Sequence, residues 1–350
     1  MINKLDLSGE WLLCLDKECK GTDLVFDDTI TLPNTTSNAK KGEYNEERET
    51  GFLTDTYKFE GFAWFRKSVD FSSLQCENLK LYLERTRITE LYIDGKKIGR
   101  QESLCTPHIY DLNEYIGTGI HEVTICVSNV GYKTKGGHLT SPDTQTNWNG
   151  ITGRIELIGY KNAHAENVML WCDIHSKTVR VTADITDGKS GKAVISAESF
   201  NSDKSHTPEV QSFEYKDGRL DAVYKMSDDC LLWSEHEPNL YKLKIDIDGD
   251  VSEHIIGMRE FKTEGGKFTI NGKKTFLRGK HDGMIFPKTA FAPTDLDEWL
   301  RVMKISKSYG MNHYRYHTCC PPEAAFIAAD MLGIYMEPQL PFWGTITEEG

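Results

Sequence analysis

Charged and imidazole side chains stand at the ends of three short, strand-like segments late in the chain. The first segment ends in His281 and Asp282, the second carries Arg315 and His317, and the third ends in Glu337. Carboxylates and imidazoles can exchange protons or accept hydrogen bonds, and a guanidinium can bind a carboxylate. In parallel β/α units such residues act where strands end and loops begin. The pattern therefore predicts a functional site at these three strand ends.

Two amphipathic helices separate the three segments. The first has apolar residues at helical spacing, with Thr294 as the expected N-cap and Gly310 near the C-cap: Leu296, Trp299, Leu300 and Met303. The second follows a Pro-Pro pair, ends at Gly333 and has one small apolar face: Ala325, Ala328, Ala329 and Leu332. Strand and helix alternation predicts parallel β/α units over residues 263–350.

Three such units are the opening of a (β/α)8 barrel, a fold that needs about 250 residues. Three strands cannot close a barrel, so we expect the sequence to be the front part of a longer protein. On the second strand, Arg315 and His317 have the same parity and should face the same way.

The chain before residue 263 reads as β-structure. Residues 1–160 contain many short alternating segments, such as 79–83, and an Asp94-Gly95 hairpin turn, which together predict a jelly-roll sandwich. Residues 161–262 continue the alternation over about 100 residues, the size of an immunoglobulin-like sandwich. The expected fold is thus multidomain: two all-β sandwiches, then the first three β/α units of a TIM barrel.

Composition excludes several classes of protein. A formal net charge of −12 argues against nucleic-acid binding, which depends on basic patches. No apolar run approaches the roughly 20 residues of a membrane span, and the first residues lack the apolar core of a signal peptide. Nine cysteines without framework spacing suit a reducing compartment. We therefore expect a cytoplasmic protein, unless a leader has been removed, with no nucleic-acid or membrane partner.

Four residues of the second β/α unit carry side chains that can bind a metal: His313, His317, Cys319 and Cys320. Four residues along a strand span about 13 Å, whereas each ligand of one zinc ion lies about 2 Å from it. His313 and His317 therefore cannot share an ion, and His313 is expected in the core or the bottom layer of the barrel. The sequence predicts no metal and no cofactor.

Several local strings, in this order, resemble glycoside hydrolase family two, the β-galactosidase, β-glucuronidase and β-mannosidase family. Residues 83–87 (LERTR), 106–112 (TPHIYDL) and 149–157 (NGITGRIEL) are similar to its sugar-binding domain. Residues 232–241 and 257–259 are similar to its middle domain, and residues 271–279 to its barrel entry. The resemblance covers essentially the whole chain.

The resemblance implies a glycosidase that removes terminal sugars from oligosaccharides or glycosides with retention of configuration. Such enzymes use two glutamates about 5 Å apart, which in this family follow the fourth and seventh barrel strands. Both are expected beyond Gly350, so residues 1–350 alone should be inactive. Family members can bind a magnesium or sodium ion, and the sequence leaves such an ion and homo-oligomerisation open.

For the residues present, the resemblance implies the wall of a sugar subsite. His317 would hydrogen-bond sugar hydroxyls, Arg315 would bind a carboxylate, Trp343 would stack on a sugar face, and Asn147 would reach the site from the first domain. His281 and Asp282 stand where better-known members carry Asn-x-His-Glu, so specificity for galactose or glucuronate is not implied. Glu337 would contact substrate or the acid/base glutamate.

Structural roles remain as alternatives. Arg315 and Glu337 could form only a rim salt bridge, Trp343 could only pack, and Asn147 could only form a turn. Two other functions also remain. The β domains could bind carbohydrate without chemistry, or Asp282 and Glu337 could be the carboxylate pair of a complete hydrolase.

Overall fold

The computed structural model describes residues 3–132, 137–141 and 146–343, so the polar stretch 136–153 lies partly outside the described residues.

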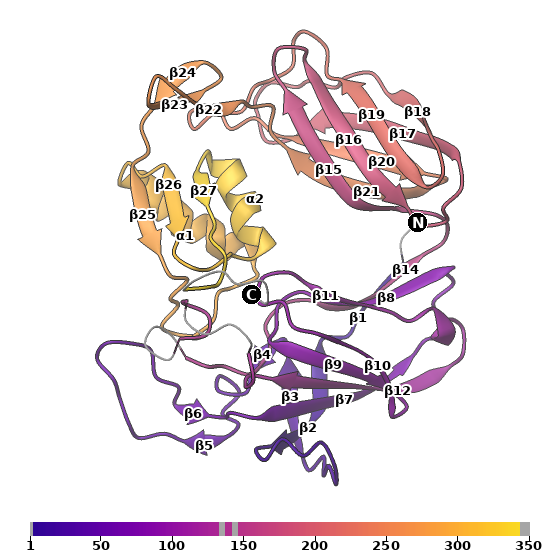
Figure 1. Ribbon diagram of the computed structural model, residues 1–350, viewed down its shortest axis with the longest axis vertical. Coiled ribbons are helices and arrows are strands. Elements are labelled where there is room, and N and C mark those ends of the chain that lie inside the picture. Colours follow the sequence, from indigo (N-terminus) through magenta and orange to yellow (C-terminus); the bar gives the residue numbers. More distant parts are fainter. Residues whose placement is uncertain (1–2, 133–136, 142–145, 344–350) are drawn as a thin grey trace.

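The first part of the chain forms two antiparallel sheets that share one apolar core (Figure 1). The four-stranded sheet has the order β1 (Asn3–Asp6), β14 (Ile155–Tyr160), β8 (Asn78–Leu83), β11 (His108–Asp111). The six-stranded sheet has the order β10 (Lys96–Gln101), β9 (Ile88–Ile93), β12 (Ile120–Ser128), β7 (Phe62–Asp70), β2 (Gly9–Asp16), β3 (Asp28–Leu32). Short elements complete this first sandwich: β4 (Asn34–Thr35) paired with β13 (Gly150–Ile151), β5 (Glu43–Tyr44) paired with β6 (Tyr57–Lys58), and the 3-10 helix η1 (Asn113–Tyr115).

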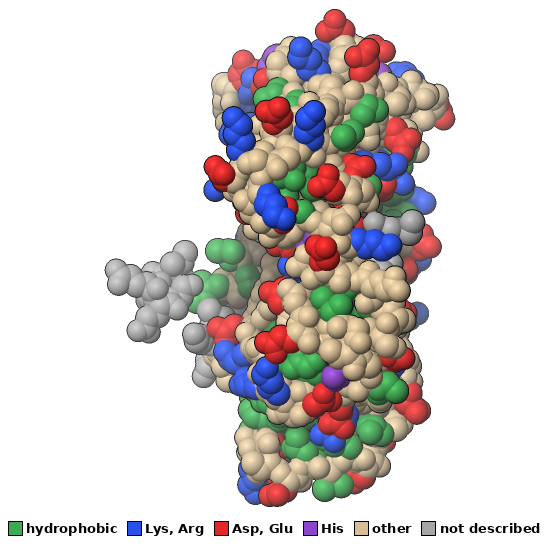
Figure 2. Space-filling view, turned by 90° about the vertical axis from the view of Figure 1, so that its right-hand side faces the viewer, with side chains coloured by type: hydrophobic (Ala, Val, Ile, Leu, Met, Phe, Trp, Pro, Cys, Tyr) green, Lys and Arg blue, Asp and Glu red, His purple; other side chains and the backbone are tan. Residues whose placement is uncertain are grey.

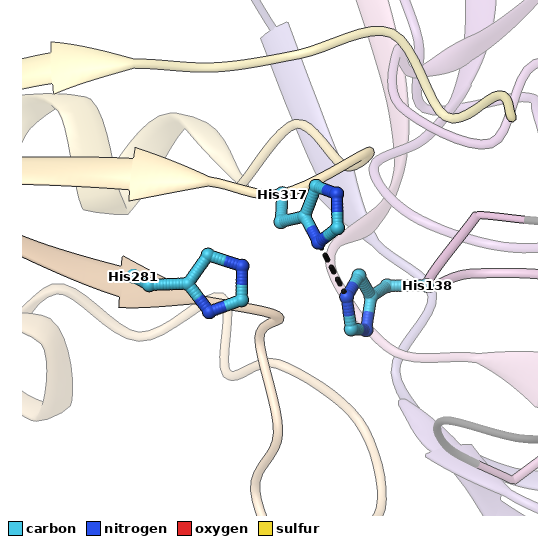
Figure 3. A group of neighbouring side chains, drawn as sticks. All are labelled: His138, His281 and His317. Carbon is cyan, nitrogen blue, oxygen red and sulfur yellow. Dashed lines mark hydrogen bonds between the residues drawn. The ribbon is translucent and has the colours of Figure 1, made fainter.

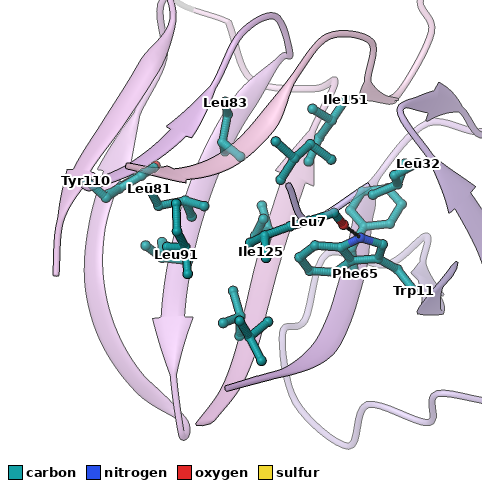
Figure 4. Packing of buried hydrophobic residues seen from close by; sticks show 14 of the residues in the cluster. Leu7, Trp11, Leu32, Phe65, Leu81, Leu83, Leu91, Tyr110, Ile125 and Ile151 are labelled. Atoms are coloured by element: carbon teal, nitrogen blue, oxygen red, sulfur yellow. Dashed lines mark hydrogen bonds between the residues drawn. The ribbon is translucent and has the colours of Figure 1, made fainter. Parts of the chain in front are cut away.

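Alternation along the strands builds the core of the first sandwich. In β8 the side chains of Leu79, Leu81 and Leu83 are fully buried, while the residues between them are partly exposed. Figure 4 shows Leu7 and Leu32 beside Phe65 and Trp11, and leucines of β8 and β9 elsewhere in the same core. The Trp11 indole N–H donates to the carbonyl of Leu7 at 2.9 Å, so the polar atom of this buried ring is satisfied.

The second part of the chain is another pair of antiparallel sheets around a separate core. One sheet has the order β15 (Ala165–Asp173), β16 (Thr178–Ile185), β19 (Arg219–Lys225). The other has the order β18 (Gln211–Tyr215), β17 (Gly191–Ser199), β20 (Tyr241–Ile247), β21 (Asp250–Ile256). The alternating apolar residues of β16 all face this core, because successive strand residues point to opposite faces.

A small antiparallel sheet leads to the last part of the chain. It contains β22 (Phe261–Glu264), β23 (Lys267–Ile270) and β24 (Lys273–Thr275). Asn271 and Gly272 form the turn between β23 and β24 with φ of 50° and 76°, as the Asn-Gly pair predicts. The last part is a parallel sheet of β25 (Gly279–Asp282), β26 (His313–Tyr316) and β27 (Tyr335–Glu337), with helices α1 (Leu296–Ser308) and α2 (Glu323–Leu332).

Both helices bury the predicted faces, but the cap of α1 differs from the prediction. Asp295, not Thr294, is the N-cap, and its carboxylate accepts from the Glu298 N–H at 2.9 Å. The Thr294 hydroxyl instead donates to the carbonyl of Thr152 in the first sandwich at 3.2 Å, so a contact distant in sequence occupies the hydroxyl. Helix α2 ends at Gly333 in the left-handed conformation, φ 69°.

Charged side chains of both signs are interspersed on the face drawn in Figure 2. None of the helices in the described part of the chain is both long and apolar enough to cross a membrane.

His108, at the start of β11, is a buried histidine whose hydrogen bonds fix its neutral form. Its Nε2 lies 2.9 Å from the carbonyl of Ser103, which can only accept, so Nε2 carries the proton. Its Nδ1 lies 2.5 Å from the Thr89 hydroxyl, which then donates to it. Burial lowers the pKa of His108 below its ordinary value.

We expect His108→Gln to reduce the pH dependence of stability. A histidine whose pKa is lowered in the folded state stabilises that state above the unfolded pKa of about 6.5, and this contribution is lost as the pH falls. The free energy of unfolding of the wild type should therefore drop more than that of His108→Gln between about pH 7.5 and pH 5.5. Urea denaturation at several pH values measures this, with the exposed His175→Gln as control. Identical pH profiles for His108→Gln and wild type would contradict the prediction.

Candidate functional site

A polar row crosses one face of the parallel sheet. His281 of β25 lies opposite Arg315 of β26, which lies opposite Glu337 of β27. Residues of the other parity, Tyr314 and Tyr316, are fully buried in the core formed with α1 and α2. The sheet thus has one face covered by helices and one polar face that reaches solvent.

Glu337 joins two levels of this polar face. Its Oε1 lies 3.4 Å from Nε of Arg315, and its Oε2 lies 3.4 Å from Nε2 of His313. His313 occupies space that Gly279 leaves open, since a Cβ at residue 279 would come within 2.6 Å of the imidazole. Burial lowers the pKa of His313. His313 therefore lies on the same face as Arg315, two residues nearer the start of β26. The sequence predicted a position in the core or the bottom layer of the barrel for this histidine.

Asp282 is separated from the polar row by parity. Its register partner is Tyr316, and its side chain is largely buried. Oδ2 pairs with Nζ of Lys280 at 2.9 Å, and Oδ1 accepts from the Met284 N–H at 2.6 Å. These contacts direct the carboxylate of Asp282 away from the row that His281, Arg315 and Glu337 form.

At the His281 end of the row, the imidazoles of His138, His281 and His317 converge from distant parts of the chain (Figure 3). Nε2 of His138 lies 3.1 Å from Nδ1 of His317, and the ring centroids of His281 and His317 are 4.9 Å apart. The ring of Trp343 lies 5.7 Å from both His138 and His317. The structure thus brings together three of the predicted residues, His281, His317 and Trp343, and adds His138.

The surroundings of His138 and His317 favour their neutral forms. Burial and the nearby His317 and His281 lower the pKa of His138. Burial, Arg315 and His281 lower the pKa of His317. Like charges at this separation disfavour each other, which opposes protonation of both rings.

The loop that carries His138 is held from both sides. The His138 N–H donates to Oγ1 of Thr318 at 2.9 Å, next to His317. Leu139 is buried in the core of the parallel sheet and its helices. The carbonyl of Leu139 accepts from Nη1 of Arg87 at 2.7 Å. The position of His138 is therefore set jointly by the first sandwich and the strand ends.

Two buried arginines of residues 83–87 make the junction. Arg87 is 1% exposed, donates from Nε to the Trp148 carbonyl at 3.0 Å, and lies 4.1 Å above the Trp148 ring. Arg85 donates from Nη2 to the carbonyl of Cys320, beyond β26, at 2.7 Å, and burial lowers its pKa. Residues 83–87, which resemble a segment of the sugar-binding domain of family two, therefore connect the first sandwich to the segment after β26.

Asn147 is held within the first sandwich. Its Nδ2 donates to the Asn129 carbonyl at 3.0 Å, and Nδ2 of Asn129 donates back to the Asn147 carbonyl at 2.7 Å. These hydrogen bonds fit the turn-forming alternative for Asn147 and do not connect it to the polar row.

His138 lies in the site although the sequence did not predict it as a site residue. Its neighbours Gly136 and Gly137 indicate only a loop. The sequence does place His281 and His317 at the ends of adjacent strands, so their proximity could have been predicted. Nothing local in the sequence shows that a loop 179 residues before His317 reaches the same point.

The fold and the polar strand ends define a mostly-β protein joined to a parallel β/α unit. Residues 163–259 match the sequence model described as glycosyl hydrolases family 2. A Formosa agariphila protein is 25% identical in an alignment of length 358 that covers 97% of this chain and 41% of that protein. A beta-galactosidase of Thermoanaerobacter pseudethanolicus is 23% identical over 318 residues, 85% of this chain and 42% of its own.

Solved structures show the same fold. A beta-glycosidase from Bacteroides vulgatus has a TM-score of 0.75 at 18% identity, covering 97% of this chain and 44% of that chain. The predicted resemblance to glycoside hydrolase family two is confirmed by the match of residues 163–259 and by these similar sequences. The chain spans about two fifths of the length of the two curated relatives.

We expect Arg87→Met to destabilise the protein by about 3 kcal/mol, because carbonyls buried against a charged donor lose their partner. Arg180→Met is the control: Arg180 is exposed and pairs with Asp221 on the surface, so its loss should change stability little. Urea denaturation compares the two variants. Equal effects of the two substitutions would show that the buried guanidinium is not needed.

Proposed function

We propose that the whole protein is an exo-acting glycoside hydrolase that removes terminal sugars from oligosaccharides by a retaining double displacement. The observation that carries this proposal is the polar row His281, Arg315 and Glu337 at the carboxyl ends of three parallel strands. Residues at this edge are the ones that contact substrate in β/α barrels. The family relationship supports the reaction type.

In this proposal the chain has three domains. Residues 1–160 form a jelly-roll sugar-binding domain, residues 161–262 an immunoglobulin-like sandwich, and residues 263–350 the start of the catalytic barrel. The buried tyrosines of β26 face the helices, as the outer layer of a barrel requires. The open polar face would then become the barrel interior once further strands pair beside β27.

Both catalytic glutamates are assigned to barrel strands after residue 350. Glu337 is the carboxylate of the polar row, and its contacts with Arg315 and His313 suit support of the subsite rather than attack on a sugar. Asp282 is turned away from the row. The two residues therefore do not form the close carboxylate pair that a retaining mechanism requires.

Both neutral and acidic terminal sugars are candidate substrates. Solved structures with this fold include a beta-galacturonidase from Eisenbergiella tayi bound to galacturonate, with a TM-score of 0.73 at 17% identity, covering 96% of this chain and 57% of that chain. An acidic sugar would need a cation in the subsite, and Arg315 is half-exposed and paired weakly enough with Glu337 to exchange partners. Neutral and acidic β-glycosides should therefore both be tested.

The proposal predicts that activity requires the strands that follow residue 350. Residues 1–350 and the same chain with its natural continuation would be assayed on aryl β-galactosides, β-glucuronides and β-galacturonides. We expect hydrolysis of at least one substrate by the longer chain and none by residues 1–350. Turnover by residues 1–350 would contradict the placement of the glutamates, and sugar binding without hydrolysis by the longer chain would favour a carbohydrate-binding protein.

In the longer chain, His317→Ala should lower kcat/KM by about tenfold to a hundredfold, the loss of one or two hydrogen bonds to sugar hydroxyls. The exposed His236→Ala is the matched control. Thermal unfolding of both variants tests whether the fold is intact. Unchanged kcat/KM in His317→Ala would remove this residue from the subsite.

A further inference from the structure

We propose that His138, His281 and His317 form a binding site for a divalent first-row transition metal such as zinc. The proposal goes beyond the glycosidase function. It shares His281 and His317 with the proposed sugar subsite, but zinc binding can be measured without any glycoside. It also departs from the expectation drawn from the sequence alone, which compared only residues of the second β/α unit.

The separation of the donor atoms suits a metal. One ligand nitrogen of each histidine lies within 4.8 Å of the other two. Nitrogens bound tetrahedrally at about 2.05 Å from zinc are separated by about 3.3 Å. Nε2 of His138 and Nδ1 of His317 are hydrogen-bonded at 3.1 Å, close to that value, so an ion would replace the proton between them. His281 is exposed, so a rotation of its side chain can bring in the third nitrogen.

Contacts of its backbone and of its ring hold His138 in place, so this ligand is positioned before an ion binds. The backbone of His138 is bound by Thr318, and the next residue, Leu139, is buried in the core beside α1 and α2. Gly283 follows β25 and packs against the His138 ring so closely that a Cβ there would come within 2.8 Å of Nδ1. A ligand held by its backbone and its ring face loses little entropy when it binds an ion.

The chemistry of the donors selects the kind of ion. Imidazole nitrogens suit zinc, copper, iron and nickel, whereas magnesium and calcium prefer oxygen ligands. Three imidazole ligands leave one position of a tetrahedral ion open. That position suits water or an anionic or hydroxyl oxygen, and Trp343 lies beside two of the ligands.

Metal binding is tested directly on the full chain. The purified protein would be stripped with a chelator, and Zn²⁺ binding would be measured by calorimetry and by elemental analysis after dialysis. We expect one zinc per chain in the wild type. His281→Gln and His138→Ala should each weaken zinc binding by more than about tenfold. The control His175→Ala, an exposed histidine of the second sandwich, should bind as the wild type does.

Cobalt substitution provides a second readout. Four-coordinate Co²⁺ absorbs visible light strongly, so the Co²⁺-loaded wild type should show this spectrum and His281→Gln should not. Because His281 is exposed, its replacement keeps the test valid even if His138→Ala fails to fold. Wild-type protein without stoichiometric zinc, or His281→Gln with undiminished binding, would overturn the proposal. Either result leaves the glycosidase proposal untouched, since no glycoside is involved.

Discussion

The arrangement of the site depends on two buried guanidinium groups. Arg85 and Arg87 follow β8 of the first sandwich, and each donates to a backbone carbonyl of a segment that lines the strand ends. A buried charge is costly unless it is hydrogen-bonded, and Nη1 of Arg85 and Nη2 of Arg87 already have no hydrogen-bond partner among the described residues. Loss of the remaining contacts would leave further groups unsatisfied. These contacts fix the first sandwich to the parallel sheet and bring the loop of His138 to β25 and β26.

One face of the parallel sheet packs in the apolar core, and the other carries the polar side chains of the candidate site. Strand parity sends Tyr314 and Tyr316 into the core with the helices, and sends His281, Arg315 and Glu337 to the open face. The tyrosines contribute apolar burial, whereas the polar row contributes little to it. Side chains of the open face are therefore free to be selected for what they bind.

Local rules predict much of this structure from the sequence. Alternation gave the strands β8 and β16, helical spacing gave α1 and α2, and the Asn-Gly pair gave the turn before β24. Parity also placed Arg315 and His317 on one side. These features depend on neighbours within a few residues, which is the range over which periodicity carries information.

Contacts between distant segments were not predictable in the same way. Asp295 caps α1 because Thr294 is bound to the first sandwich, and His138 reaches the site because Arg87 and Thr318 hold its loop. Both cases were decided by a partner that no local pattern names. Asp282, grouped with His281 in the sequence, lies on the other face because successive strand residues alternate, and parity alone could have predicted this.

The distance along the chain between His138 and His317 has a kinetic consequence. The two rings meet across 179 residues, so their contact requires the parallel sheet to be docked against the first sandwich. Contacts between residues so far apart in sequence carry a loop-closure cost and slow folding. We therefore expect the histidine cluster to form together with this docking, and a chain whose parts have folded but not docked contains all three histidines without the cluster.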